Sequence, residues 1–478
     1  MKRIIYLMVI AFALSSCVVK PYTTPSGEEL NLEDSFRNLT DTSGDLAQTP
    51  WRDIFVDEHL QALIDTVLAG NIDMQQALLR VDQAYSMLRS SRAQIAPSIG
   101  VGASYGGAVY LDGKTSYADE LDVSLLSWEI DLWGKLYANK EASKAQFWQT
   151  QEAAKATRQS LIAATATAFY NLSALESKKD VIIEAISNRT EYLATTLDLK
   201  ESGKVNEVAV QQAVAQLAEV QAALPSINMS IELAENSLAL LAGRTEISFK
   251  RKNLKEGVCE VSHLETGTPV QLLSYRSDVR EAEMNYRSKH YLFMASRAAL
   301  YPSLTIGASY SLVDVFSAQT SILGTLAGLT APIFNGRKLR SAKESAEAEA
   351  NIARLEFQKT VFTAIREVND AVISIRSYDS IVTHQTVQLK ALEKAYEYSG
   401  DLFLSGYANY LDVLVAQTSV YNLQQAIIDS YLGTLTSRIE LYRALGGGSD
   451  EGDIIPQAVV KNDPAVTKKA KKSKNTKK

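Results

Sequence analysis

The sequence predicts a mixed α and β fold that is mostly α-helical and internally duplicated. The segments 97–105 and 302–310 both begin Pro-Ser and both end Gly-Ala-Ser-Tyr. Within them, apolar residues alternate with glycine, serine or threonine, which is the period of a β-strand. A long run without proline follows each strand region, and at ~1.5 Å per residue it would form a helix on the order of 100 Å long.

The bulk composition sets wide limits on function. The 478 residues are 46% hydrophobic and 22% charged, with a formal net charge of -6. This length allows two or three ordinary domains or one large elongated one, and the charge gives no indication of nucleic-acid binding. Two cysteines are too few for a disulfide framework. Since no run of about 18 apolar residues occurs, no membrane-spanning helix is expected.

Residues 1–16 are predicted to be a signal peptide, because Lys2-Arg3 precedes a short apolar stretch. Cys17 follows two serines, and this arrangement resembles the lipobox of bacterial lipoproteins, whose cysteine carries the lipid. The resemblance implies lipidation at Cys17, and Val18 after it favours the outer membrane. An ordinary signal peptide with an incidental cysteine is the alternative. Residues 17–56 are expected to form an extended, lipidated strap.

The first structural repeat is expected at 57–244. Apolar residues at helical spacing cover its first part, and a β-hairpin is expected at 98–130. Near Leu125 the apolar positions change face, which indicates a bulge or a bend. A long helical hairpin should then occupy 136–242.

The turn of this helical hairpin contains Gly203, and Asn206 is placed to cap the returning helix. Pro225 lies within the returning helix, where a kink or break is expected, because proline lacks an amide hydrogen and its ring clashes with the preceding turn.

The second repeat is expected at 268–448, after an equatorial connector at 245–267. It repeats the first at a shift of 202 to 205 residues, as Pro97 matches Pro302 and Gly134 matches Gly336. The predicted elements are a helix, a β-hairpin at 303–334 and a long helical hairpin at 339–445. The tail at 449–478 is rich in lysine and is expected to be disordered.

The strand alternation predicts two chemically different faces. The set expected to face lipid in the second hairpin is Leu304, Ile306, Ala308 and Tyr310. Thr305, Gly307 and Ser309 would face a shared, water-filled lumen. Four strands cannot close a barrel, and open sheet edges are not tolerated in hydrocarbon. Several copies must therefore pool their strands, although the sequence does not give their number.

Three segments, with Cys17 and the duplicated Pro-Ser strands, carry a resemblance to a known family. They are Ile130-Asp-Leu-Trp-Gly-Lys135, Pro332-Ile-Phe-Asn-Gly-Arg337 and Ser405-Gly-Tyr-Ala-Asn-Tyr-Leu-Asp-Val-Leu414. The chain resembles the TolC-type outer-membrane efflux proteins of the lipoprotein branch, from about residue 49 to residue 448.

The resemblance implies a homotrimer that pools twelve strands in one transmembrane β-barrel and twelve helices in a tunnel across the periplasm. It implies an exit duct in the outer membrane, which conducts small toxic compounds or drugs. The implied partners are a periplasmic adaptor and an inner-membrane transporter, expected to be proton-driven because of the lipid anchor. No cofactor, metal site or enzymatic activity is expected.

The resemblance places the tunnel mouth at the two helical turns. The family pattern there reads Leu-Asp-Val-Leu-Asp-Ala, so Asp412 matches its first aspartate and Val415 replaces its second. We expect three Asp412 carboxylates to ring the closed mouth, with a raised pKa and attraction for cations. The alternative is local, because Asp412 is a favourable first-turn acid in a helix that Asn409 caps.

The exposed turns are also candidates for docking the adaptor. The residues expected to dock are Gly203, Lys204, Asn206, Gly406, Tyr407 and Asn409. Tyr407 and Tyr410 are candidate packing or adaptor contacts, and exposed turn residues without a partner are the alternative.

Other functions remain open at the level of sequence. An outer-membrane channel of a type I protein secretion system would use the same architecture. A structural coiled-coil lipoprotein without a pore would explain the long helices but not the two matched hairpins. An enzyme is disfavoured, because the sequence contains no nucleophile elbow, phosphate loop or paired metal-ligand motif.

Overall fold

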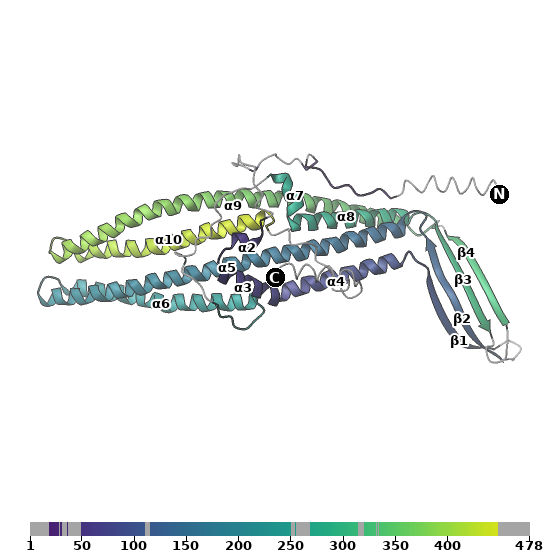
Figure 1. The fold of residues 1–478 in the computed structure, drawn as a ribbon, viewed down its shortest axis with the longest axis horizontal. Helices are drawn as coiled ribbons and strands as arrows, with labels where there is room; N and C mark the ends of the chain where they lie inside the picture. Colours follow the sequence, from purple (N-terminus) through teal and green to yellow (C-terminus); the bar gives the residue numbers. More distant parts are fainter. Residues whose placement is uncertain are drawn as a thin grey trace.

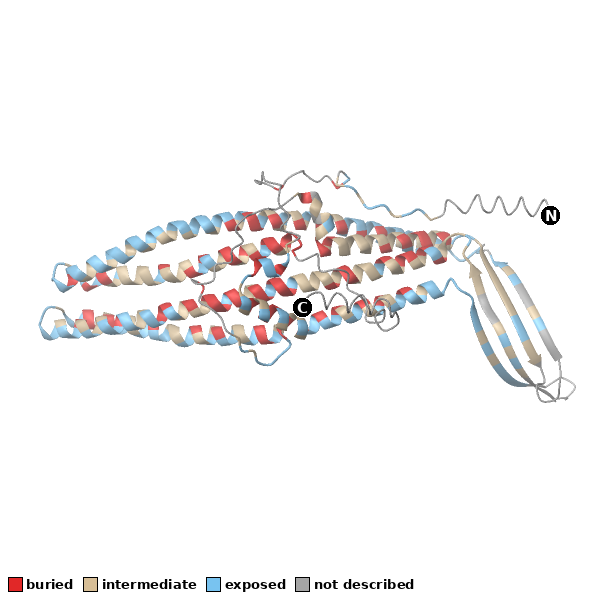
Figure 2. Ribbon diagram, viewed as in Figure 1, coloured by how far each residue is buried: buried red, intermediate tan, exposed pale blue. Residues whose placement is uncertain are grey.

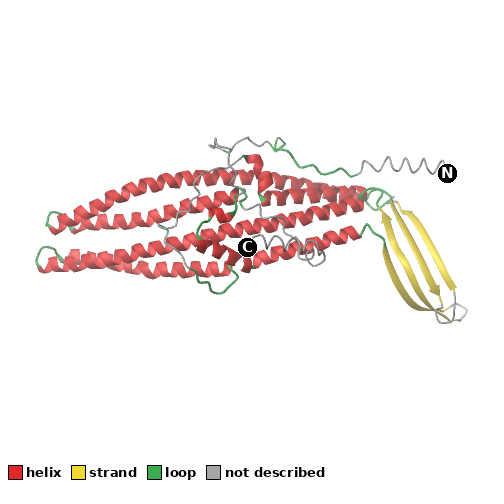
Figure 3. Ribbon diagram, in the orientation of Figure 1, coloured by secondary structure: helices red, strands yellow, loops and turns green. Residues whose placement is uncertain are grey.

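A computed structural model of the chain describes residues 19–27, 29–30, 36, 49–109, 115–249, 254, 268–313, 320–330, 332 and 334–447. The helices form an elongated body, with a β-sheet at one end and two helical turns at the other (Figures 1 and 3). The expected signal peptide, Cys17, most of the connector at 245–267 and the tail at 449–478 lie outside the described residues.

The first repeat contains three short or medium helices, a β-hairpin and a long helical hairpin. Its elements are α2 (Trp51–Ile54), α3 (Glu58–Gly70), α4 (Ile72–Ala93), β1 (Ser98–Val109), β2 (Thr115–Ile130), α5 (Lys135–Glu201) and α6 (Glu207–Leu241). Side-chain caps start the shorter helices. The Asp57 carboxylate accepts hydrogen bonds from two backbone N–H groups of α3, and the Asn71 side chain accepts one from α4.

The second repeat follows the same plan. Its elements are η2 (Pro269–Gln271), α7 (Leu272–Tyr275), α8 (Ser277–Ala298), β3 (Ser303–Val313), β4 (Thr320–Thr330), α9 (Lys338–Leu404) and α10 (Tyr410–Ala444). The equivalent helices have equal lengths: α4 and α8 have 22 residues, α5 and α9 have 67, and α6 and α10 have 35. The duplication therefore extends from the sequence to the dimensions of the fold.

The helices form a single wall. In the half near the sheet, α5 packs against α4 and α8, and α8 packs against α9. In the half near the turns, α5 packs against α6 and α10, and α10 packs against α9 (Figure 1). The wall thus ends in α4 or α6 on one side and in α9 on the other.

The sheet has four antiparallel strands in the order β1-β2-β3-β4. Its outer strands, β1 and β4, each pair on one side only. The register of β2 against β3 shifts between Leu125 and Trp128. This confirms the bulge predicted near Leu125, and it keeps Trp128 and Ile130 on the same face as the apolar residues of β3.

The main core lies where the short helices meet the middle of the wall (Figure 2). Trp51 and Phe55 are buried there with residues of α3, α5 and α10. The strap expected at 17–56 is therefore wrong at its end, because a packed helix begins at Trp51. Two further strap residues, Leu30 and Phe36, are buried against α8 and α9. The apolar residues of this segment do not recur at a regular spacing, so their burial could not be predicted from the sequence.

Two other predicted boundaries need correction. β4 ends at Thr330, so the second β-hairpin does not extend to residue 334, since Pro332 cannot donate to a ladder. α6 is not broken at Pro225, because the helix is continuous from Glu207 to Leu241. Pro225 is exposed, and water can therefore reach the carbonyl groups that lose their helical partner.

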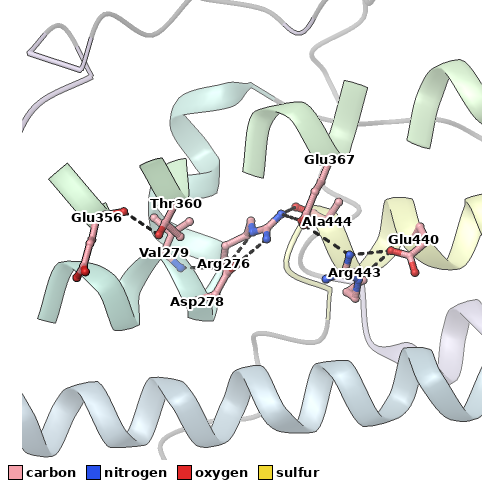
Figure 4. Close-up of polar contacts among 9 residues, drawn as sticks. All are labelled: Arg276, Asp278, Val279, Glu356, Thr360, Glu367, Glu440, Arg443 and Ala444. Carbon is pink, nitrogen blue, oxygen red and sulfur yellow. Dashed lines mark hydrogen bonds and ion pairs between the residues drawn. The ribbon is translucent and has the colours of Figure 1, made fainter. Parts of the chain in front are cut away.

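A buried arginine joins three helices near the end of α10 (Figure 4). The Arg276 guanidinium donates two hydrogen bonds to Asp278, of 2.9 and 2.6 Å, and one of 2.9 Å to the carbonyl of Ala444. It also pairs with Glu367 on α9 at 2.8 Å. Burial raises the pKa of Asp278, but the hydrogen bonds from Arg276 outweigh it and leave that pKa below its ordinary value. The network fixes α8 to both α9 and α10.

Candidate functional site at the helical tips

Both helical hairpins turn in the same way at the end far from the sheet. Gly203 and Gly406 have φ values of 72° and 80°, a left-handed conformation that favours glycine. The N–H groups of Gly203 and Lys204 donate to carbonyl groups of the last turn of α5, and those of Gly406 and Tyr407 do the same in α9. These are Schellman motifs, so the turns predicted from glycine are confirmed in position and conformation.

Side chains cap the first turns of the returning helices α6 and α10. The Asn206 side chain accepts a hydrogen bond of 3.2 Å from the N–H of Ala209, as predicted for a cap. In the second turn, the N–H of Asn409 donates to the Asp412 carboxylate at 3.1 Å. Asp412 thus stabilises the start of α10 locally, which is the alternative that the sequence left open for it. Its carboxylate is exposed, so the same group also lies at the tip surface.

The residues predicted to dock a partner lie on the tip surface. Gly203, Lys204, Asn206, Gly406, Tyr407 and Asn409 are all exposed. Tyr407 is 84% exposed, whereas Tyr410 is 7% exposed. Of the two tyrosines, Tyr407 is therefore available for a partner and Tyr410 is a packing residue. Val415 is 59% exposed and lies one helical turn after Asp412.

An aromatic cluster lies directly behind the tips. Tyr192 of α5 contacts Phe403 of α9 and Tyr410 of α10, with ring centroids 6.3 and 6.2 Å apart, and Phe403 and Tyr410 are 5.8 Å apart. Tyr396 lies 6.4 Å from Tyr192. Burial raises the pKa of Tyr192, Tyr396 and Tyr410, so these rings stay neutral. The cluster holds the two helical hairpins of one chain together.

A buried guanidinium joins α5 to α6 and also contacts the second hairpin. Arg189 of α5 donates a hydrogen bond of 2.7 Å to the carbonyl of Gln216 on α6. It lies 3.7 Å from the Glu219 carboxylate and over the ring of Tyr421 on α10. Burial lowers the pKa of Arg189, and Glu219 and Tyr421 oppose that shift. Neither Arg189 nor the aromatic cluster was predictable from the sequence, because their partners lie on separate helices.

The first turn has an ion pair at its base. Lys200 of α5 lies 2.5 Å from Glu207 of α6, and the Gln211 side chain donates to the same carboxylate at 2.7 Å. Hydrogen bonds from Lys200 and Gln211 lower the pKa of Glu207. The ion pair is exposed, so it adds little stability, but it fixes the two ends of the turn to each other.

At the opposite end, the sheet register places the alternating apolar residues on one face. Leu304 pairs with Leu329, Ile306 with Ala327 and Tyr310 with Leu323, and paired residues share a face. The described apolar face also contains Ile99, Val101, Ala103, Tyr105, Leu121, Val123, Trp128, Ile130, Ala308 and Leu312. Ile99 and Leu323 are each 74% exposed, so the described residues leave this face uncovered.

Among the residues whose side chains the structure describes, the second face of the sheet is polar or small. Thr305, Gly307 and Ser309 lie on it, and so do Asp122 and Glu129 of β2. A side-chain carbon in place of Gly102 would collide with the Asp122 carboxylate. Glycine in β1 therefore leaves space for an acid on this face.

The described residues show neither a metal site nor a helical membrane span. No group of three or more His, Cys, Asp or Glu side chains placed to hold a metal ion occurs within the described ranges. None of the described helices combines the length and the apolar character that a membrane crossing requires.

Comparison with known proteins gives consistent matches along most of the chain. The model of the outer membrane efflux protein family matches residues 63–244 and 268–447. The probable outer membrane lipoprotein SilC of Salmonella typhimurium is 26% identical over 450 residues, which cover 91% of this chain and 97% of SilC. The toluene efflux pump outer membrane protein TtgC of Pseudomonas putida is 26% identical over 464 residues, or 94% of this chain and 96% of TtgC.

A solved structure extends the match to the whole fold. The crystal structure of CusC superposes with a TM-score of 0.83 at 23% identity, and the match covers 90% of this chain and 100% of that chain. The fold described above is therefore the fold of a known channel protein.

Proposed function

The chain belongs to the outer membrane efflux protein family, and we propose that three copies of it assemble into one exit duct. As a member of this family it is an outer-membrane component of an efflux system. The observation that carries the trimer proposal is the pair of unpaired edges, β1 and β4, in a sheet with one largely apolar face. Such edges require partners in hydrocarbon, and the matching edge of another copy is the simplest partner.

The helical wall supports the same closure. The two helices that form the lateral edges of the wall each expose apolar residues. On α4 these are Ile72, Leu79 and Met87, and on α9 they are Ile352, Leu355 and Phe362. Each set follows helical spacing along one face. Because the two sets lie at opposite ends of the wall, α9 of one copy can cover α4 of the next. Repeated contacts of this kind close into a ring.

We propose that the barrel lies in the outer membrane and that the helical tunnel crosses the periplasm. Lipidation at Cys17 would add an anchor beside the barrel, and the relative SilC is named a lipoprotein. The exposed tips, with Lys204, Asn206, Tyr407 and Asn409, would meet a periplasmic adaptor. A proton-driven inner-membrane transporter would supply the cargo.

The proposed cargo is a small toxic compound or drug. The relative TtgC is named as part of a toluene efflux pump, which supports this class. Thr305, Gly307 and Ser309 lie on the proposed lumen face, and short side chains of this kind make a wide, unselective path. Selection would then lie with the transporter.

Three measurements test the exit duct. The purified full chain should conduct ions in a planar bilayer, and on a gel it should migrate as a heat-modifiable trimer. A deletion strain should become sensitive to a panel of toxic compounds and should regain resistance with the intact gene. Loss of a secreted protein without any new sensitivity would instead favour a type I secretion channel.

We also propose that Asp412 contributes negative charge to the closed mouth. Replacement by alanine removes both the charge and the cap at Asn409, whereas Asp412→Asn removes the charge and keeps an oxygen acceptor. If the charge acts at the mouth, both variants should lose cation block and gain conductance. If only the cap matters, Asp412→Asn should conduct like the wild type. Val415→Asp should add a second acid and strengthen cation block.

A further inference from the structure

A basic pocket lies between α4 and α5, close to the sheet. Its volume is about 400 Å³, and it is lined by Arg92, Ile95, Ala96, Lys140, Glu141 and Lys144. This volume falls in the range of about 300–1,000 Å³ that is usual for small-molecule sites. α4 ends at Ala93 and α5 begins at Lys135, so the pocket lies at the junction between helices and strands.

The pocket has an excess of positive charge. Glu141 is its one carboxylate, lying 3.2 Å from the Lys140 Nζ and 3.9 Å from the Lys144 Nζ. Arg92 is exposed, and it makes no ion pair with any residue that the structure describes. Three cations therefore share one carboxylate, and the pocket keeps unneutralised charge for an anion.

Aromatic rings hold both lysines in place. The Lys140 Nζ lies 4.4 Å from the centre of the Tyr137 ring, and the Lys144 Nζ lies 4.7 Å from that of Trp148. These cation–π contacts restrict two otherwise flexible side chains. The positive charge is thus already arranged before any ligand binds.

The pocket lies on the side of the apolar sheet face. The indole N–H of Trp128 donates a hydrogen bond of 3.0 Å to the carbonyl of Ile95, which lines the pocket. Trp128 pairs with Ile306 and so belongs to the apolar face. The carboxylate of Glu129, next in the chain, belongs to the opposite face.

A second set of contacts connects the pocket to the N-terminal strap. The Arg287 guanidinium on α8 lies over the rings of both Tyr22 and Trp148, at 5.7 and 5.0 Å. Trp148 in turn contacts Lys144. The strap, α8 and the pocket therefore share one surface of the wall. Val19 packs close to Gly134 at the junction, only two residues after Cys17.

We propose that this pocket binds the phosphate of an anionic glycerophospholipid at the membrane surface. The proposal rests on the proposed function, since it requires the apolar sheet face to lie in the bilayer. Lysine and arginine next to a bilayer attract anionic head groups, and Trp and Tyr are enriched at the same depth. The acyl chains would lie along the apolar strand face above the pocket, next to Ile99.

Native mass spectrometry of the full-length oligomer in detergent tests the proposal. Phosphatidylglycerol, phosphatidylcholine and inorganic phosphate are titrated separately, and bound lipid is counted. The triple variant R92Q/K140Q/K144Q is compared with K390Q/K394Q, which removes two exposed lysines from α9 far from the sheet. Phosphatidylglycerol should bind the wild type and the control alike, and the triple variant at least about tenfold more weakly, because each removed cation is worth roughly fivefold.

The single variant Arg92→Gln covers the possibility that the triple variant does not fold. Arg92 is exposed and forms no described ion pair, so its loss should leave the fold intact and weaken phosphatidylglycerol binding roughly fivefold. Equal binding of phosphatidylcholine, full displacement by inorganic phosphate, or wild-type affinity in the variants would each overturn the proposal. Single-channel conductance of the same wild-type preparation separates the two ideas, because its absence would contradict the duct itself.

Discussion

The two long helices, α5 and α9, have equal lengths but very different surroundings. Buried residues occur along α5 from Leu136 to Thr196. In α9, apart from Phe403 near its end, they are confined to the stretch between Ala350 and Ile375. Figure 2 shows the same contrast, with long exposed stretches on α9. The cause is position, because α5 lies inside the wall and α9 lies at its end.

The duplication and the position of a helix in the wall determine different properties of α5 and α9. Repetition gives the two helices the same length and the same closing turn. Position decides which face of each helix is covered by the chain itself. The uncovered face of α9 is then available to a second copy, which is the basis of the trimer proposal.

The largest expected effect comes from two phenylalanines on α9. Phe357 is 1% exposed and Phe362 is 52% exposed. Phe357→Ala should lower the free energy of unfolding by about 3–5 kcal/mol, because it leaves a cavity in the core. Phe362→Ala should leave the folded chain nearly unchanged but weaken the trimer, since it truncates the proposed interface.

Urea unfolding and heat-modifiable gel mobility distinguish these two outcomes. A Phe362→Ala chain that unfolds earlier while its trimer resists heat like the wild type would contradict the assignment of this face to a neighbouring copy.

The two turns provide a second contrast of smaller effect. At a shift of 203 residues, the exposed pair Lys200–Glu207 corresponds to Phe403–Tyr410, which is buried and aromatic. Phe403→Ala should lower the free energy of unfolding by about 2–3 kcal/mol. This is less than for a substitution in the central core, because the tip can relax around the cavity. It should also raise single-channel conductance by loosening the link between the hairpins. Tyr407→Ala, on the exposed side of the turn, is the matched control and should change neither stability nor conductance.

The smallest expected effect is the pH response of the first turn. The pKa of Glu207 in the folded chain is lowered, chiefly by its hydrogen bond with Lys200. This carboxylate therefore contributes fully to the stability of the first turn above its ordinary pKa. The contribution is lost as pH falls through the pKa that the group has in the folded chain. Hydrogen exchange should show faster opening of the first turn in acid, and Glu207→Gln should remove that pH dependence. The second turn has no Lys–Glu ion pair at the equivalent positions, which are Phe403 and Tyr410.

Much of the fold was predictable because its features are local. Gly203 and Gly406 adopt the left-handed conformation that glycine favours, and the alternation around Ile306 defines the strand faces without reference to distant residues. The bulge near Leu125 was predictable for the same reason, since the apolar positions change their parity there.

The remaining features depend on contacts between distant segments. Tyr22 meets α8 some 269 residues away, and the cluster of Tyr192, Phe403 and Tyr410 joins three helices. No period or spacing in the sequence connects such residues. Pro225 does not break α6, because it lies on an exposed side of the helix, where a missing hydrogen bond is tolerated.

Cysteine accessibility on β3 tests the proposed duct. Each chain should supply an open-edged sheet whose Thr305 face lines a water-filled lumen and whose Ile306 face meets lipid. In the assembled protein in membranes, a charged aqueous thiol reagent should label Thr305→Cys and leave Ile306→Cys unlabelled. Neighbouring residues of a strand point to opposite faces, so the pair controls for depth. Labelling of Ile306→Cys but not Thr305→Cys would contradict this assignment of the two faces.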